Sequence, residues 1–187
     1  MKTINYLYIF ILLCITVSAA GAQEIKWKNL SFGVTAQYLF TDGDLNKFWG
    51  NTLAGGVLFN YKIDDSFSLE GGLLGTYLKP KSDPDRIPNF IFLNIPAGLK
   101  YSLEVNRRLK FNIFSGIQNH SFIYSGEAAE LVEENDIEHE LGLFIQAGIE
   151  VLTFKNIGVE LNTKIQNVFT LPDQLKIINL GLTIYFY

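Results

Sequence analysis

The sequence predicts an all-β protein, an eight-stranded antiparallel up-and-down transmembrane β-barrel. Three observations lead to this fold class. Apolar and polar residues alternate with a period of two along eight stretches of the 187-residue chain. The connections between these stretches are alternately short and long. Charged residues make up only 18% and aromatic residues 14%, against the roughly 25% of charged residues that is usual in soluble domains.

The eight stretches each have the length of a strand that crosses a membrane at a tilt. In the first, Leu30, Phe32 and Val34 alternate with Ser31 and Gly33, and the later stretches repeat this pattern. The predicted strands are 30–40, 53–63, 67–77, 92–101, 109–118, 141–151, 157–166 and 178–187. Residues one apart on a strand face opposite sides, so each strand has one apolar and one polar face.

The connections divide into tight turns and longer polar loops. The turns are predicted at 64–66, 104–108 and 153–156, and the loops at 41–51, 79–90, 124–139 and 168–176. Outer-membrane barrels have short turns in the periplasm and long loops outside. Both chain termini are therefore expected in the periplasm.

A soluble lipocalin-like barrel is the main alternative, because its strands alternate too. Its outer, water-facing side would be rich in lysine and glutamate, whereas the polar face here is mostly Gly, Ser, Thr, Asn and Gln. We interpret that face as the lining of a narrow lumen that holds a polar network. Its predicted charged members are Lys62, Glu70, Lys100, Lys110, Glu150, Glu160 and Lys164.

Aromatic residues at both ends of the strands favour the membrane barrel. Two rings of such residues are typical of the interfaces of a membrane barrel. One ring is predicted at the turn end, from Tyr61, Phe67, Tyr101, Phe111 and Phe186, and the other at the loop end, from Tyr38, Phe40, Tyr77 and Phe169.

The stretch FLNIPAGLKY (92–101) places Pro96 inside a strand. Proline has no N–H for the ladder and is normally found at strand edges or bulges. If Pro96 faces the lumen, a local bulge or lumenal water can relieve the missing hydrogen bond. Lys100, on the same face, is expected to pair with interior carboxylates, because an unpaired buried charge is expensive.

The N-terminus predicts export. Lys2 precedes the apolar run YLYIFILLCITV, and Ala20 and Ala22 fit a small-residue cleavage site, so residues 1–22 are predicted to be a Sec signal peptide and residues 23–187 the barrel domain. The run is shorter than the ~20 residues of a membrane helix. Its removal takes away the chain's one cysteine, Cys14, and leaves a formal net charge of −5. No basic patch indicates nucleic acid. The expected location is the outer membrane of a Gram-negative bacterium.

FLNIPAGLKY is similar to the "YLEIPLLLKY" strand of the PorT-like outer-membrane β-barrel family. NIFSGIQ, FIQAGIE and the aromatic C-terminus extend the resemblance over most of residues 29–187. The resemblance implies the barrel fold and, since some members are accessory parts of a secretion system across the outer membrane, a role of that kind. Asn94 stands where the family commonly has Glu, which removes one carboxylate that could pair with Lys100.

An eight-stranded barrel is just filled by its own side chains, so pore activity is not expected. We predict a non-enzymatic protein without cofactor or metal, which acts through its loops or turns as an interaction, assembly or secretion-accessory protein. The alternatives are a structural or adhesion barrel without an obligate partner and, less favoured, a lipid-modifying enzyme. The expected partners are outer-membrane lipid, lipopolysaccharide and other envelope or secretion proteins.

Candidate site residues outside the lumen are few. Candidate loop contacts are Phe48, Trp49, Glu130, Glu133, Glu134 and Asp136. The loop 125–139 could also carry a short helix. Asp42, Asp44 and Asn46 begin a calcium-loop pattern that lacks its later Gly and Glu, so a solvated turn is the default. His120 and Ser121 are the candidate catalytic pair, but adjacent strand residues face opposite sides, which argues against catalysis between them.

Overall fold

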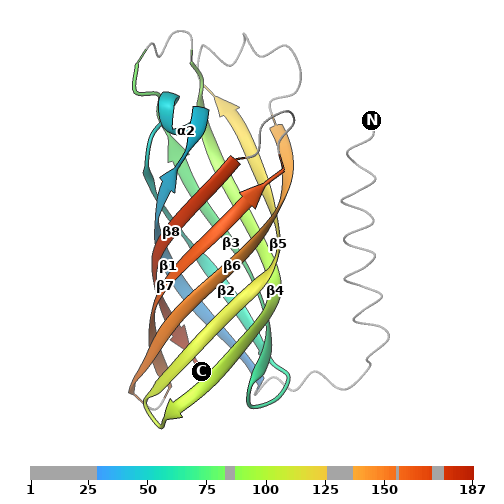
Figure 1. The fold of residues 1–187 in the computed structure, drawn as a ribbon, viewed down its shortest axis with the longest axis vertical. Coiled ribbons are helices and arrows are strands. Elements are labelled where there is room, and N and C mark those ends of the chain that lie inside the picture. The colour runs from blue at the N-terminus through green and yellow to red at the C-terminus, as the bar shows by residue number, and fades with distance from the viewer. Residues whose placement is uncertain (1–28, 83–86, 126–136, 155, 170–174) are drawn as a thin grey trace, which may run out of the picture.

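The structure is a computed structural model, and it describes residues 29–82, 87–125, 137–154, 156–169 and 175–187. Eight strands form one closed antiparallel barrel in chain order, as the sequence predicts (Figure 1). The strands are β1 (Leu30–Thr41), β2 (Thr52–Lys62), β3 (Phe67–Leu78), β4 (Asn89–Asn106), β5 (Leu109–Ser125), β6 (Ile137–Phe154), β7 (Ile157–Val168) and β8 (Leu175–Phe186). The predicted signal peptide, residues 1–22, lies outside the described residues.

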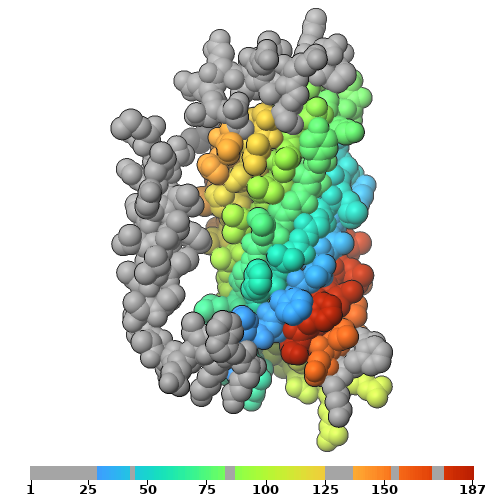
Figure 2. All heavy atoms as spheres, turned by 180° about the vertical axis from the view of Figure 1, so that it is seen from behind, coloured from blue at the N-terminus to red at the C-terminus, as the bar shows by residue number. Residues whose placement is uncertain are grey.

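The barrel closes where the first strand meets the last. Val34 on β1 pairs with Val57 on β2 and with Ile184 on β8. Figure 2 shows the blue first strand lying directly beside the red last strand on the outer wall. Closure pairs both edges of the sheet and so leaves no unpaired edge strand in the membrane, where free backbone groups would cost several kcal/mol each.

The two faces of the barrel wall have opposite chemistry. On β1 the side chains alternate strictly between exposed and buried. The exposed ones are apolar, such as Phe32 and Val34, each 50% exposed, while the buried ones include Thr35 and Gln37, each 2% exposed. A lipocalin-like barrel would have the reverse arrangement, so the structure excludes that alternative. The outer wall is suited to hydrocarbon.

The two ends of the barrel also differ. At the end with the longer connections, which we call the loop end, the interior is apolar. A short helix, α2 (Gly43–Phe48), lies over this end (Figure 1), and its Leu45 joins the buried cluster. The cluster consists of Leu39, Leu45, Ala54, Leu78, Phe90, Phe92, Phe122, Val168 and Ile177, with Trp49, Tyr124 and Leu175 packed against it. The opposite end, with the tight turns and the C-terminus, is the turn end.

The first loop differs from the sequence prediction. The turn expected in 41–51 contains α2, whereas the helix considered for 125–139 falls largely on residues outside the described part of the chain. Strands β4, β5 and β6 run beyond their predicted ends, so that β6 begins at Ile137 and β4 continues to Asn106. At the loop end the longer hairpin is stabilised by a hydrogen bond of 2.8 Å from the Tyr124 hydroxyl to Glu138 Oε2, a contact between strands that periodicity does not reveal.

Pro96 is accommodated without the predicted bulge. Its side chain is buried on the lumenal face, and it pairs with Gln118 on β5. On the β3 side, pairing stops after Gly71–Ala97 and resumes at Leu74–Asn94 in the same register. A bulge would shift the register, so this part of the prediction is wrong. The ladder instead lapses over two residue pairs beside the residue that has no N–H.

Gly98 on β4 and Gly116 on β5 pair at a point where the two strands approach very closely. A Cβ atom built on Gly98 would lie 2.1 Å from the Ser115 carbonyl oxygen, and one on Gly116 would lie 2.1 Å from the Ala97 carbonyl oxygen. Both clashes are with backbone, which cannot rotate away as a flexible side chain can. Glycine is therefore required at this pair by space.

We expect Gly98→Val to impair barrel assembly, because its Cβ must push β4 and β5 apart, and overpacking costs at least about 1–3 kcal/mol. The folded fraction after refolding into detergent can be measured by the heat-dependent shift in gel mobility. Gly71→Ala is the matched control, since its nearest non-neighbouring atom would be the Pro96 carbonyl oxygen at 3.5 Å, an ordinary contact. Equal folded fractions for the two variants would contradict the steric account.

Candidate functional site

The lumen contains a continuous series of polar side chains below the apolar loop-end cluster. Its first layer consists of amides. Asn94 Nδ2 donates to Gln118 Oε1 at 3.3 Å and to Gln166 Oε1 at 3.2 Å. Gln166 Nε2 donates to Asn179 Oδ1 at 3.4 Å, and Asn179 Nδ2 donates to Gln37 Oε1 at 2.8 Å. The bond from Asn94 on β4 to Gln166 on β7 joins strands that are not neighbours and so crosses the lumen, while the other three bonds each join neighbouring strands.

The second layer is centred on Lys100, whose side chain is 4% exposed. Its Nζ lies 3.0 Å from Glu160 Oε2 and 3.3 Å from Glu70 Oε2, and both carboxylate side chains have no exposed surface. Nζ also donates to the Tyr185 hydroxyl at 2.8 Å and lies 4.0 Å from the centre of that ring. The ammonium group, which has three N–H donors, is thus fully engaged.

Neighbouring amides complete this layer by donating to the same carboxylates. Glu160 Oε1 accepts from Gln146 Nε2 at 3.2 Å and from Asn162 Nδ2 at 3.1 Å. Asn112 Nδ2 bridges Glu160 Oε2 and Glu150 Oε2. Removing charges from water costs several kcal/mol per ion, which is offset only when the geometry is good and extra hydrogen bonds satisfy the groups. The amides of Gln146, Asn162 and Asn112 supply these extra hydrogen bonds.

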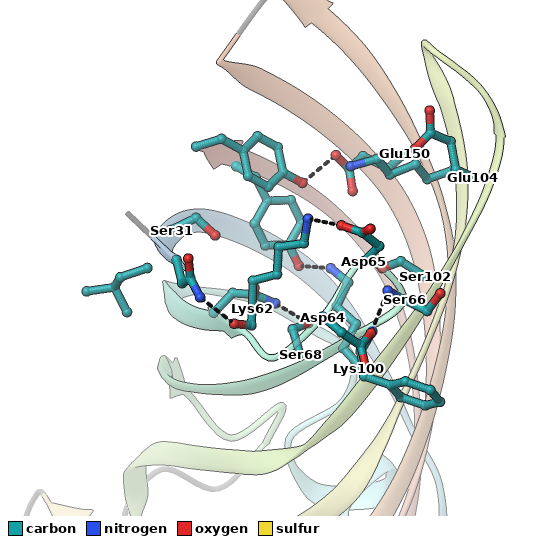
Figure 3. A pocket seen from close by; sticks show the side chains of 17 residues that line it. Ser31, Lys62, Asp64, Asp65, Ser66, Ser68, Lys100, Ser102, Glu104 and Glu150 are labelled. Carbon is teal, nitrogen blue, oxygen red and sulfur yellow. Dashed lines mark hydrogen bonds and ion pairs between the residues drawn. The ribbon is translucent and has the colours of Figure 1, made fainter. Parts of the chain in front are cut away.

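Below the ion-pair layer the lumen opens at the turn end into a recess of about 450 Å³ (Figure 3). Lys100 and Tyr185 lie at its inner end, and hydroxyl groups of the turn-end residues line its walls. The lining residues are Asn29, Leu30, Ser31, Asn60, Lys62, Asp64, Asp65, Ser66, Phe67, Ser68, Lys100, Ser102, Glu104, Lys110, Glu150, Tyr185 and Tyr187. The recess is therefore polar and carries both signs of charge.

The rim of the recess is formed in part by the turn after β2. Asp64 Oδ1 accepts hydrogen bonds of 2.8 Å from the backbone N–H groups of Ser66 and Phe67, which is the geometry of an Asx turn. Lys62 Nζ lies 2.8 Å from Asp65 Oδ1. The hydrogen bond and positive charge of Lys62 lower the pKa of the Asp65 carboxyl from its usual value of 3.8. Both side chains are exposed, so this pair contributes little to stability.

The predicted lumenal residues occupy different parts of this arrangement. Lys100, Glu70, Glu160 and Glu150 lie in the buried network, whereas Lys62 lies at the rim. The other two predicted lysines contact aromatic rings. Lys110 Nζ lies 5.2 Å from the centre of the Tyr187 ring, in the recess, and Lys164 Nζ lies 5.7 Å from that of Phe144, deep in the lumen.

Sequence reasoning missed the aromatic members of the network, Tyr185 and Tyr187. The Tyr185 hydroxyl donates to Glu70 Oε2 at 3.0 Å, and the Tyr187 hydroxyl donates to Glu150 Oε1. The sequence does indicate that Tyr185 faces the lumen, because it continues the alternating series of Asn179, Gly181 and Thr183 on that face of the strand.

The candidate loop contacts are placed as follows. Trp49 packs in the loop-end cluster, with its ring centre 5.0 Å from that of Phe90, and its Nε1 donates to the Pro88 carbonyl at 2.9 Å. Phe48 is half-buried and lies beside Trp49. Glu130, Glu133, Glu134 and Asp136 lie outside the described residues. The ordered first loop thus contributes its tryptophan to the seal of the barrel.

The candidate calcium pattern at 42–46 leads into a short helix in the structure. Asn46, from α2, accepts hydrogen bonds from Lys81 Nζ at its backbone oxygen and, at 3.1 Å, at its Oδ1. These bonds connect the first loop to the second and occupy Asn46 oxygens that a cation would need. No group of three or more His, Cys, Asp or Glu side chains that could hold a metal ion occurs in the described part of the chain.

His120 and Ser121 face opposite sides of the wall, as predicted. His120 is fully buried in the lumen, stacked on Phe92 with ring centres 5.1 Å apart. Ser121 lies on the outer side, where its Oγ is 2.8 Å from Nδ1 of His139 on β6. His120 therefore cannot act as a base for Ser121.

A closed eight-stranded barrel with an apolar outer wall and a lumen filled by hydrogen-bonded side chains defines an outer-membrane barrel without an open pore. The model of the outer membrane protein beta-barrel domain family matches residues 10–186, and the chain belongs to this family. It is accordingly assigned to the outer membrane of Gram-negative bacteria. No helix in the described ranges is long and apolar enough to cross a membrane.

Solved structures of outer-membrane barrels are similar in fold. Neisserial surface protein A is 13% identical, with a TM-score of 0.61, and the match covers 84% of this chain and 96% of that one. Ail, the attachment invasion locus protein of Yersinia pestis, solved with the heparin analogue sucrose octasulfate, is 14% identical with a TM-score of 0.53, covering 84% and 95%. Among curated proteins no match is found. At these identities the similarity shows the fold alone.

We expect Lys100→Met to destabilise the folded barrel by about 3–5 kcal/mol, because it leaves the Glu70 and Glu160 carboxylates buried without their cation. Denaturant unfolding in lipid vesicles, followed by tryptophan fluorescence, measures the change. Lys62→Met is the matched control and should change stability by no more than about 1 kcal/mol, because its ion pair is exposed. If the two variants lost similar amounts of unfolding free energy, burial of the Lys100 ion pairs would not be what stabilises the barrel.

Proposed function

We propose that the chain is a non-conducting outer-membrane barrel that acts as an interaction protein through the recess at its turn end, which faces the periplasm. One observation carries this proposal. The lumen is accessible from the turn end but is closed further in by the Lys100 layer, the amide layer and the apolar loop-end cluster. A recess that ends inside the barrel can receive a partner but offers no path for a solute.

The chemistry of the recess favours a short polar segment of a periplasmic protein. Its volume lies within the roughly 300–1,000 Å³ typical of binding pockets. The serine hydroxyls and Asn60 can bond to peptide groups, and the lining also carries the cations Lys62 and Lys110 and the carboxylate of Glu104. Charges of both signs at the rim steer a partner of complementary pattern and fix its register.

A more specific assignment is to the PorT-like group and its secretion-accessory role. The resemblance of FLNIPAGLKY supports it, and that strand contributes Lys100 to the inner end of the recess. The lipid and lipopolysaccharide of the outer membrane are the expected surroundings of the apolar wall. Contacts through the acidic residues Glu130, Glu133, Glu134 and Asp136 remain a prediction.

Surface adhesion is the second candidate function. The observation that favours it is the ordered platform at the loop end, where Lys81 bonds to Asn46 and Trp49 bonds to Pro88. The fold similarity to Ail, an attachment invasion locus protein, points to the same candidate. A preorganised surface loses less entropy when it binds a partner.

Site-specific photo-crosslinking in native outer membranes distinguishes the two candidates. A crosslinking residue is placed at Ser102, in the recess, or at Asn46, at the loop end. We expect one discrete adduct from Ser102, which is at least about tenfold weaker with Lys110→Glu and unchanged with Lys47→Glu, a matched charge reversal at the loop end. Such a change corresponds to about 1.4 kcal/mol of binding.

The absence of any adduct from Ser102 would reject the recess as the binding site. Adducts from Asn46 alone would favour adhesion. An adduct from Ser102 that both charge reversals leave unchanged would show that the recess charges do not select the partner.

A further inference from the structure

The apolar outer wall carries a hydrogen-bonded group of polar side chains near the loop end, on β5 and β6. Asn119 and Ser121 lie two residues apart on β5 and so share one face of the strand. Ser121 pairs directly with His139 across the β5–β6 ladder. Asn119 Nδ2 donates to Ser121 Oγ at 3.1 Å, and Ser121 Oγ lies 2.8 Å from His139 Nδ1. The barrel does not need these groups for its internal network, because they face away from the lumen.

The hydrogen bonds fit the histidine tautomer in which Nδ1 accepts. The Nδ2 group of Asn119 can only donate, so Ser121 Oγ accepts that bond and retains its own hydrogen for another partner. Donation of this hydrogen to His139 Nδ1 satisfies both groups and places the proton of the neutral imidazole on Nε2. Ser121 is then a hydroxyl already hydrogen-bonded to a base, which is the arrangement that activates a serine nucleophile.

The position of the group corresponds to the membrane interface. The backbone N–H of Phe169, a member of the predicted loop-end aromatic ring, donates to the Leu141 carbonyl at 2.9 Å. Leu141 pairs with Asn119, and the Ser121–His139 pair lies two residues further toward the loop end. Aromatic rings of this kind lie at the headgroup level, which is close to the ester bonds of membrane lipids.

The surroundings of the group also suit a lipid. Ile117 and Leu141 flank it on the side toward the membrane centre and are 42% and 54% exposed. An acyl chain can lie along these side chains while its ester reaches Ser121. His139 is exposed, whereas Ser121 is only 6% exposed, between its neighbours. At this exposure the Ser121 hydroxyl is reached only where its neighbours on the wall move aside.

We propose that Ser121 and His139 form a nucleophile–base pair that hydrolyses an acyl ester of an outer-membrane lipid. In the first step His139 Nδ1 takes the hydroxyl proton while Ser121 Oγ bonds to the ester carbonyl carbon. The Asn119 amide is placed to donate to the resulting oxyanion. The carbon–oxygen bond to the lipid alcohol then breaks, and the alcohol leaves with the proton held by His139.

The second step regenerates the serine. A water molecule gives a proton to His139 and adds to the acyl-serine carbonyl, the bond to Oγ breaks, and the proton returns to Ser121 as the fatty acid leaves. The reaction consumes one water and one ester and needs no oxidant, reductant or metal. This activity goes beyond the proposed interaction role and, if present, would make the predicted absence of enzyme activity wrong.

The purified chain, reconstituted in vesicles of phosphatidylethanolamine or of lipopolysaccharide, tests the proposal. Released fatty acid is measured by mass spectrometry, and the two vesicle types identify the lipid that supplies the ester. We expect release from one of them, reduced about 100-fold or more by Ser121→Ala and by His139→Gln, since acid–base catalysis typically contributes 10²–10⁴-fold. Ser115→Ala, a change at an exposed serine on the same strand, should have no effect.

A fluorophosphonate probe gives a second readout that does not depend on the choice of lipid. The probe should label Ser121 of the wild-type chain, as located by peptide mass spectrometry, and labelling should be lost with His139→Gln. Folding of each variant is confirmed by its heat-dependent gel mobility. Absence of label on Ser121 together with no release from either vesicle would overturn the proposal, as would release that survives Ser121→Ala.

Discussion

The buried ammonium group of Lys100 is the constraint on which the interior of this barrel depends. It comes from β4, while its two carboxylate partners come from β3 beside it and from β7 on the other side of the lumen. A charge at this depth is tolerated only with partners of opposite sign and good geometry. The partners in turn require donors of their own, which Tyr185, Asn112 and Asn162 supply. One buried cation with two carboxylate partners thus constrains the identity of several residues on other strands.

The narrow lumen explains why these side chains can meet at all. In an eight-stranded barrel the interior is just wide enough to be filled by side chains, so Lys100 and Glu160 reach each other although their strands are not neighbours. Within the wall, the close approach of the β4 and β5 backbones requires glycine at positions 98 and 116. The closed interior leaves function to the two ends and the outer wall. The turn end has a polar recess, the loop end an apolar seal, and the described part of the wall carries the hydrogen-bonded Asn119, Ser121 and His139.

Features set by the local pattern of residues were predictable, and features set by contacts between distant strands were not. Alternation alone predicted the eight strands and the inward orientation of Lys100, and the cost of a buried charge predicted that it needs carboxylate partners. The choice of Glu70 and Glu160 among the acidic residues depends on the register of closure, which no single strand determines. For the same reason the sequence suggested His120 as the neighbour of Ser121, whereas the histidine that contacts it is His139, 18 residues away on β6.

Two further differences have local physical causes. A bulge was one of two ways expected to relieve the missing ladder hydrogen bond at Pro96, but the strand keeps its register when pairing to β3 lapses over only two residue pairs. The helix at Gly43–Phe48 has too few residues for a periodic signal, and it is held by packing of Leu45 and by the Lys81–Asn46 bonds. Such a short helix depends on tertiary contacts rather than on its own propensity.

We infer that the side chains of the lumen close the barrel to ions. The most direct test is the conductance of a planar lipid bilayer that contains the purified, folded chain. We expect no stable single-channel steps, because the Lys100 layer and the loop-end cluster lie in series across the lumen. Reproducible steps of constant size from the wild-type chain would contradict it.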